Sequence, residues 1–236
     1  ASLFYRMIQP DYTSLGTYYM SNNYHGLGVN LSTVLLRRLS LSASFSGQAD
    51  NLSGNQLYTT RGFVYNANAS TRIGNLGLAA GYNGYRQVQG DGTARVNDTT
   101  RVDRIMHSLY VSPSYMIAGD QTSHTVSLSA NYTRNEDLNA FATGESDVTT
   151  YALGASYSLG VKPWDMDFTT SFSHQHTDGY QREYTSDVLS LTTGRSFLKE
   201  KNMNAQLTLS MCYNEVKHQM KSLSIGADAS VGYTYN

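Results

Sequence analysis

The feature that most constrains this chain is a period-two alternation of apolar and polar residues, which recurs from one end of the sequence to the other. Between residues 26 and 35, for example, Leu, Val and Thr alternate with Gly, Asn and Ser. Successive side chains of a β-strand point to opposite faces of its sheet, so each such segment has one apolar and one polar face. The alternation predicts an all-β chain whose strands separate two different environments.

Twelve segments carry this pattern and follow one another as hairpins. The predicted strands cover residues 3–8, 26–35, 39–46, 63–70, 76–83, 105–117, 126–132, 151–159, 164–173, 189–193, 203–213 and 223–235. Short turns are predicted at Arg37-Arg38, Gly74-Asn75, Gly119-Asp120, Val161 to Pro163 and Lys199 to Lys201. Longer loops are predicted at 9–23, 51–58, 90–100, 137–147 and 176–183, with 216–220 as a short exception. Long strands joined alternately by short turns and longer loops are typical of transmembrane β-barrels.

The polar faces contain Ser, Thr, Asn and Gly, and few charged residues. Charged residues make up 15% of the chain, and 17 basic residues nearly balance 18 acidic ones, which excludes a broad basic surface for nucleic acid. A soluble β-sandwich or soluble barrel would turn the polar faces to water, and soluble surfaces normally carry more Lys, Glu and Arg. An uncharged polar face suits the lumen of a membrane barrel better, although the soluble fold stays open as the alternative.

The predicted fold class is therefore all-β, a closed antiparallel transmembrane β-barrel of about twelve strands that forms a single domain over residues 1–236. The longest apolar run has only four residues, Tyr115 to Ala118, which is far below the roughly twenty that a spanning helix needs. The first ten residues lack the basic start and apolar stretch of a signal peptide, so we expect any such peptide to have been removed.

Two segments resemble a known group of proteins. The N-terminal stretch with Phe4-Tyr5-Arg6, Pro10-Asp11-Tyr12 and Ser14 to Tyr19 is similar to the first segment of outer-membrane barrels of the Bacteroidota type. The final Gly232-Tyr233-Thr234-Tyr235, followed here by Asn236, resembles the C-terminal assembly signal of outer-membrane proteins. The resemblance implies an outer-membrane location, contact with outer-membrane lipid, and a place in an export, uptake or assembly complex with other envelope proteins. Such barrels often form the C-terminal part of a longer protein.

Candidate catalytic and metal-binding residues are few. His174 and His176 share one strand face and lie near Asp178 and Glu183, which is the best arrangement for a metal ion or an acid–base pair. No spacing signature of a metalloenzyme accompanies them, so we expect a solvated strand end and neither an enzyme nor a cofactor site. The single cysteine, Cys212, excludes an internal disulfide framework.

The polar face is the more informative surface, because the side chains that line a pore determine what passes through it. Its predicted charged members are Arg6, Asp165, Asp167 and Asp228. So few charges indicate a lumen that is either weakly selective or filled by another polypeptide segment. The sequence therefore favours a non-enzymatic barrel in a transport or export/assembly complex. A stand-alone diffusion porin and an outer-membrane lipid hydrolase or protease are the alternatives.

Overall fold

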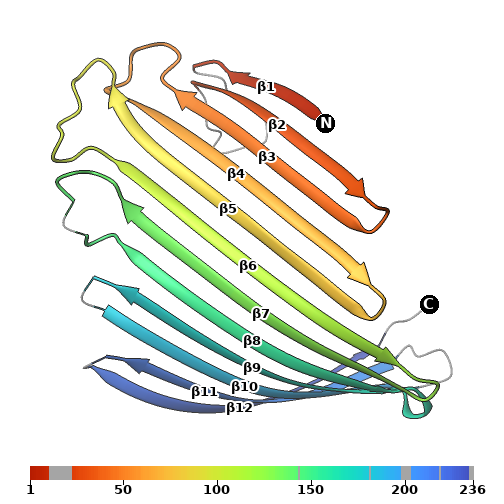
Figure 1. Cartoon of the computed structure of the whole chain (residues 1–236). Helices are drawn as coiled ribbons and strands as arrows, with labels where there is room; N and C mark the ends of the chain where they lie inside the picture. The colour runs from red at the N-terminus through yellow and green to blue at the C-terminus, as the bar shows by residue number, and fades with distance from the viewer. Residues whose placement is uncertain (11–22, 143, 181, 198–202, 218, 234–236) are drawn as a thin grey trace. The chain divides into compact units, whose positions relative to one another are not determined.

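The computed structural model describes residues 1–10, 23–142, 144–180, 182–197, 203–217 and 219–233. These residues form twelve antiparallel strands in one sheet, and the strands lie in sequence order from β1 to β12 (Figure 1). The strands are β1 Ser2–Ile8, β2 Tyr24–Leu35, β3 Leu39–Asp50, β4 Tyr58–Ile73, β5 Leu76–Asp91, β6 Asp103–Ala118, β7 Thr122–Asp137, β8 Val148–Val161, β9 Met166–Gly179, β10 Arg182–Phe197, β11 Met203–Val216 and β12 Met220–Tyr233. The all-β class and the number of strands are as predicted.

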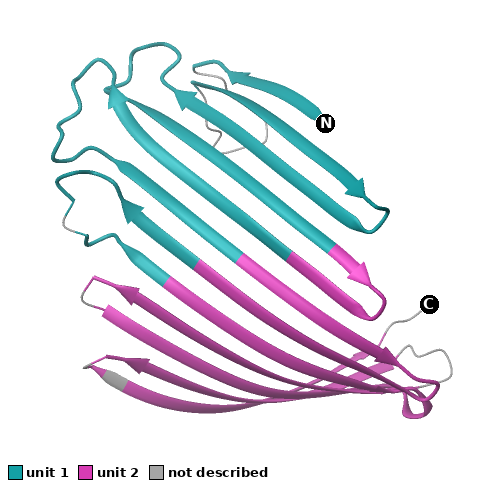
Figure 2. Ribbon diagram, in the orientation of Figure 1, with its two compact units in different colours: residues 1–70, 80–109, 133–149 teal, residues 71–79, 110–132, 150–236 magenta. Residues whose placement is uncertain are grey.

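The sheet contains two compact units, which Figure 2 distinguishes by colour. Unit 1 consists of Ala1–Ser70, Ala80–Leu109 and Thr133–Thr149, and unit 2 of Thr71–Ala79, Tyr110–Tyr132 and Thr150–Asn236. Within unit 1, β2 pairs with β1 and β3, and within unit 2, β9 to β12 pair in order. Residues that lie opposite one another in these registers share a face of the sheet.

The short connections lie at one end of the strands, here called the turn end, and most longer ones at the other, here called the loop end (Figure 1). At the turn end, Leu36 and Arg37 have positive φ angles of 50° and 59°, and Arg38 N–H closes the turn on the carbonyl of Leu35. Gly74, with φ 59°, opens the next turn. The predicted turns at Arg37-Arg38, Gly74-Asn75 and Gly119-Asp120 are confirmed, whereas Lys199 to Lys201 lies outside the described residues.

One predicted loop is wrong. Residues 176–183 were expected to be a long connection, yet β9 continues to Gly179 and β10 begins at Arg182. His176 pairs with Thr185, and Asp178 pairs with Glu183. The alternation fades there because the apolar face itself becomes polar near the loop end, although the backbone pairing continues.

The sheet has no apolar core among the residues that the structure describes: none of their hydrophobic side chains is buried. Large apolar side chains instead lie exposed along one face, for example Leu128 at 50% and Leu191 at 50%. A soluble β-sandwich would bury this face against a second sheet. The exposed apolar rows therefore favour a sheet with lipid on this side. The structure shows no helix among the described residues that is long and apolar enough to cross a membrane.

Candidate functional site: the polar face of the sheet

Hydroxyl groups from neighbouring strands bond to one another across the polar face. In unit 2, the hydroxyls of Ser171 and Ser190 lie 2.7 Å apart, and those of Thr192 and Thr208 lie 3.1 Å apart. In unit 1, Asn66 donates a hydrogen bond of 3.0 Å to the Ser44 hydroxyl. Because Ser and Thr hydroxyls both donate and accept, such pairs satisfy part of their hydrogen-bonding capacity and leave the rest for water or a ligand.

Three of the four predicted lumen residues lie on this face. Arg6 is opposite Gly26 in the β1–β2 pair, and Asp228 is opposite Thr208 in the β11–β12 pair. Asp167 lies four residues before Ser171 in β9 and therefore shares its face. Asp165 is placed differently, because it precedes β9 in the turn and has a left-handed backbone conformation with φ 48°.

An ion pair on the polar face was missed by the sequence reasoning. The Arg104 guanidinium lies 3.6 Å from the Asp137 carboxylate, at the loop end of β6 and β7. Arg104 lies four residues before Ser108 in β6 and therefore shares its face. The Ser108 hydroxyl accepts a hydrogen bond from Thr133 on the polar face. The alternation of faces along β6 would place Arg104 on the polar face, but the predicted strand begins one residue later, at Ile105. Asp137 falls in a predicted loop.

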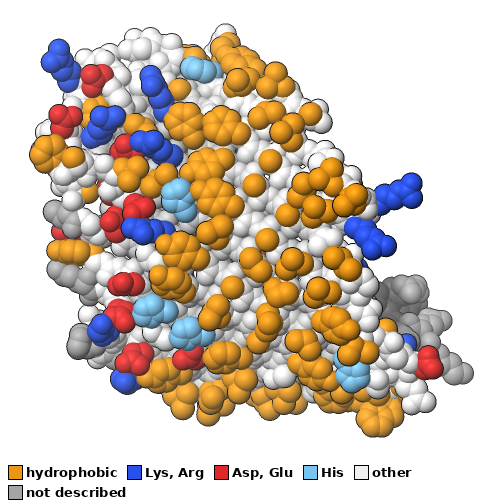
Figure 3. All heavy atoms as spheres, in the orientation of Figure 1, with side chains coloured by type: hydrophobic (Ala, Val, Ile, Leu, Met, Phe, Trp, Pro, Cys, Tyr) orange, Lys and Arg blue, Asp and Glu red, His pale blue; other side chains and the backbone are white. Residues whose placement is uncertain are grey.

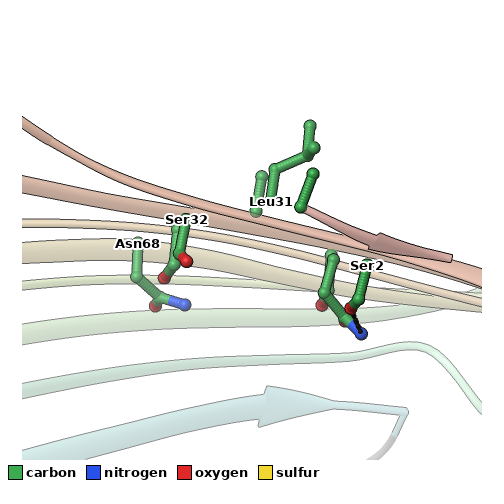
Figure 4. A pocket seen from close by; sticks show the side chains of 9 residues that line it. Ser2, Leu31, Ser32 and Asn68 are labelled. Atoms are coloured by element: carbon green, nitrogen blue, oxygen red, sulfur yellow. Dashed lines mark hydrogen bonds between the residues drawn. The ribbon is translucent and has the colours of Figure 1, made fainter.

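A groove of about 380 Å³ lies beside the first residues of β1. Figure 4 shows Ser2, Ser32 and Asn68 on one side of the ribbon and Leu31 on the other. Asn30 donates a hydrogen bond of 3.3 Å to the Ser2 hydroxyl. The described side chains that line the groove are uncharged and, apart from Leu31, are Ala, Ser and Asn, so the groove has room and hydrogen-bonding groups for a neutral polar ligand or a polypeptide backbone.

The apolar face is bounded by aromatic and histidine side chains at both ends of β7 and β8. Near the loop end, the rings of Tyr132 and Tyr151 lie 5.3 Å apart. Near the turn end, His124 Nδ1 lies 2.7 Å from the Tyr157 hydroxyl. Tyr132 follows His124 by eight positions, which is about 27 Å along a strand. At a strand tilt of about 40°, this length corresponds to about 20 Å of membrane depth. That span is close to the apolar band of a membrane barrel, about 25 Å tall.

Figure 3 shows how side chains are distributed over this apolar face. Hydrophobic side chains cover its middle, and charged side chains gather along the edge where the loops lie. Two ion pairs belong to this charged edge: Arg86 Nη2 lies 3.1 Å from Asp103 Oδ2, and Lys221 lies 3.0 Å from Glu215. An apolar band with a charged border is the arrangement that a lipid bilayer with polar headgroups requires.

The predicted histidine pair lies on the apolar face, near the loop end. His174 and His176 do point to the same face, and the expected Glu183 lies beside His176, whereas their partners Asp187 and Thr185 were not predicted. His174 Nδ1 lies 2.7 Å from Asp187, and His176 Nδ1 lies 3.0 Å from the Thr185 hydroxyl. The Glu183 carboxylate is 3.8 Å from His176 Nε2. Within the described residues, no three His, Cys, Asp or Glu side chains gather into a set that could hold a metal ion.

Glu183 has a second basic neighbour. It accepts a hydrogen bond from Lys217, in the β11–β12 connection, and this hydrogen bond raises the pKa of the Lys217 ammonium. Glu183 is therefore shared between an ammonium and an imidazole. The arrangement is that of an ion-paired strand end.

Comparison with known proteins identifies the fold. No protein-family model matches the sequence, and no curated protein matches it. Among solved structures, the ferric-catecholate import receptor Fiu from K12 E. coli in its closed form is similar with a TM-score of 0.58 and 8% identity; the match covers 88% of this chain and 45% of that chain. The chain thus spans slightly less than half the length of that receptor.

A second match covers nearly all of both chains. The KdgM porin matches over 91% of this chain and 94% of its own, at 10% identity and a TM-score of 0.31. That score is too low to support an argument, so the fold is assigned from the similarity to the receptor. The chain has the fold of an outer-membrane β-barrel protein.

Proposed function

We propose that β1 pairs with β12, so that the sheet closes into a barrel that spans the outer membrane as a single domain. The observation that carries this proposal is the exposed apolar face opposite a polar face whose hydroxyl groups bond to one another. In hydrocarbon, each unpaired backbone group costs several kcal/mol, so both edge strands must find partners. Pairing them with one another meets this requirement within one chain.

The barrel's role is transport, as one component of an export, uptake or assembly complex of the envelope. Two observations support this role: the fold is shared with an import receptor, and the polar face offers many hydroxyls but few charges. The groove beside β1, with Ser2 and Asn68 on that face and Leu31 on the other, adds space for another polypeptide segment. The resemblance to Bacteroidota barrels, in residues that lie partly outside the described ranges, supports the association with partners.

A stand-alone, weakly selective diffusion pore is the second candidate. The observation that favours it is the spread of hydroxyl pairs across the polar face in both units, from Ser108 and Thr133 to Thr192 and Thr208. Such a face holds water along its length. In this case Arg6, Asp167 and Asp228 would set a modest ion preference.

The barrel acts without an enzymatic site. The nearest approach to one is Thr185–His176–Glu183, a hydroxyl, an imidazole and a carboxylate on the apolar face. This set would suit a lipid hydrolase or a protease if it were catalytic. The test is the double substitution His174→Ala and His176→Ala, assayed for lipid and peptide hydrolysis. No hydrolysis by the parent or by the variant is expected, and an activity that disappears with the histidines would overturn this part of the proposal.

Planar-bilayer recording of the isolated protein, combined with purification from its own membrane, tests the role. If the barrel belongs to a complex, the isolated protein should show little steady conductance, and specific subunits should co-purify with it. A steady, weakly selective conductance from a protein that purifies alone would favour the diffusion pore and contradict the complex.

A further inference from the structure

Two loops at the loop end of unit 1 are joined by hydrogen bonds. One loop, 92–102, connects β5 to β6, and the other, 138–147, connects β7 to β8 (Figure 1). The Leu138 amide donates to the carbonyl of Asp103 at 2.6 Å, and the Asn139 side-chain amide donates to the carbonyl of Arg101 at 2.8 Å. The two loops therefore form one surface, although they are far apart in the sequence.

Each loop is also held by its own side chains. In the second loop, the Asp137 carboxylate accepts the amide of Asn139, and Asn139 Oδ1 accepts the amide of Phe141 at 3.0 Å. In the first loop, Asn97 Oδ1 accepts both the amide and the hydroxyl of Thr99. Such turns restrict the backbone before any ligand arrives, which lowers the entropic cost of binding.

A recess of about 350 Å³ opens between these loops. Its apolar side consists of Leu138 and Phe141, and the Phe141 ring is 60% exposed. Its polar side consists of Asp98, Arg101, Asp103 and Asn139. The volume is at the small end of the range for ligand sites, which suits a ligand of one or two rings.

The charges around the recess balance. Arg86 forms a two-point contact with Asp103, with distances of 3.2 and 3.1 Å, so that carboxylate is already neutralised. Of the remaining charged groups, the Asp98 carboxylate can accept hydrogen bonds from a ligand, and the Arg101 guanidinium can donate them. An anionic or cationic ligand would meet one of them with like charge, whereas a neutral ligand with several hydroxyls can donate to Asp98 and accept from Arg101.

We propose that this recess binds a neutral saccharide. A sugar ring presents an apolar C–H face, which packs on the exposed Phe141 ring, and a rim of hydroxyls, which both donate and accept hydrogen bonds. The site lies on the two loops and the first residue of β6, where it would capture a glycan before or without passage through a lumen. It does not depend on barrel closure, on partners or on conductance.

The test is ligand-observed saturation-transfer NMR and calorimetry on the full chain in lipid nanodiscs, with methyl glucoside, methyl galactoside, methyl mannoside and N-acetylglucosamine as probes. Phe141→Ala should weaken binding about two- to tenfold, because the aromatic contact is lost. Arg101→Gln should weaken it about tenfold or more, because a charged hydrogen-bond donor is lost.

Two variants serve as matched controls. Tyr180→Ala removes an aromatic ring that is 47% exposed in another connection, and Arg95→Gln removes an arginine from the same loop that does not line the recess. Both should bind as the parent does, and circular dichroism should show the same strand content in all four variants. Failure of all four sugars to bind, or equal binding by parent, Phe141→Ala and Arg101→Gln, would overturn the proposal. So would displacement of a bound sugar by glycine or phosphate, because it would show a preference for charge.

Discussion

The imidazole of His174 faces the carboxylate of Asp187 directly across β9 and β10, with 2.7 Å between Nδ1 and Oδ1. Both side chains lie on the apolar face, and their exposed fractions are 38% and 33%. Phe172 and Leu189 form the next pair toward the turn end on the same face. The polar pair therefore marks the place where the apolar band ends.

This position predicts how the pair contributes to stability. Asp187→Ala should lower the free energy of unfolding by up to about 1 kcal/mol, since a partly exposed pair is screened by solvent. Replacing both partners, by His174→Phe with Asp187→Leu, should cost less than the single change, because no polar group is left without a partner. Urea unfolding in lipid vesicles measures both. A double variant that is less stable than Asp187→Ala would contradict the interpretation.

Leu128 lies midway between His124 and Tyr132 and should sit near the middle of the bilayer. Leu128→Arg is expected to lower the free energy of unfolding by about 2–4 kcal/mol, the cost of a cation at that depth. Ser127→Arg, one residue away on the polar face, is the matched control and should be tolerated. Folding yield and urea stability in vesicles measure the difference. Equal effects of the two changes would argue against lipid on the apolar face.

How far the strands could be predicted depended on the environment of their side chains. Within the apolar band, period two located all twelve strands, because the apolar and polar faces carry different residue types at alternate positions. Beyond the band both faces are polar, so the pattern disappears while the pairing continues. This explains why the predicted strands at 63–70 and 76–83 are short compared with β4 and β5, and why the pattern predicts a loop at 176–183.

Gly28 leaves space for the ring of Phe4, its partner in the β1–β2 register. A side chain at position 28 would place its Cβ 2.3 Å from the Phe4 ring, so Gly28→Val must displace that ring and loosen β1. We expect a loss of about 1–3 kcal/mol in the free energy of unfolding. Gly232→Val is the control, because among the described residues no atom outside its chain neighbours lies within 4 Å of its Cβ position. Similar urea midpoints for the two variants would show that the packing of Phe4 on Gly28 contributes little.

Neutralising the charges of the polar face should change the ion preference of any conductance. Asp167→Asn and Asp228→Asn each remove a negative charge and should shift the reversal potential toward anions, and Arg6→Gln should shift it toward cations. Lys221→Gln, whose residue lies on the apolar face opposite Glu215, should have no effect. Reversal potentials in a salt gradient measure these shifts. A shift with Lys221→Gln and none with the other three variants would contradict the prediction, because it would place the conducting surface on the apolar face.

The candidate sites were less predictable than the strands. The period-two alternation placed Arg6, Asp167 and Asp228 on the polar face, and it showed that His174 and His176 share one face. It could not identify Asp187 or Thr185 as the partners of these histidines, because the partner depends on the register between strands. The recess between the loops depends on hydrogen bonds between segments about forty residues apart, such as that from Asn139 to Arg101, and no local pattern indicates them.

Disulfide cross-linking between β1 and β12 tests barrel closure most directly. In a Cys212→Ser background, Leu3, Tyr5 and Met7 would each be changed to cysteine in combination with alternate β12 residues from Leu223 to Val231. Cross-strand neighbours have Cα separations that a disulfide can bridge. Antiparallel closure predicts one register: each step of two residues forward in β1 moves the best partner two residues back in β12. Absence of any such series in the membrane-embedded protein, or purification as a soluble monomer without detergent, would contradict the barrel.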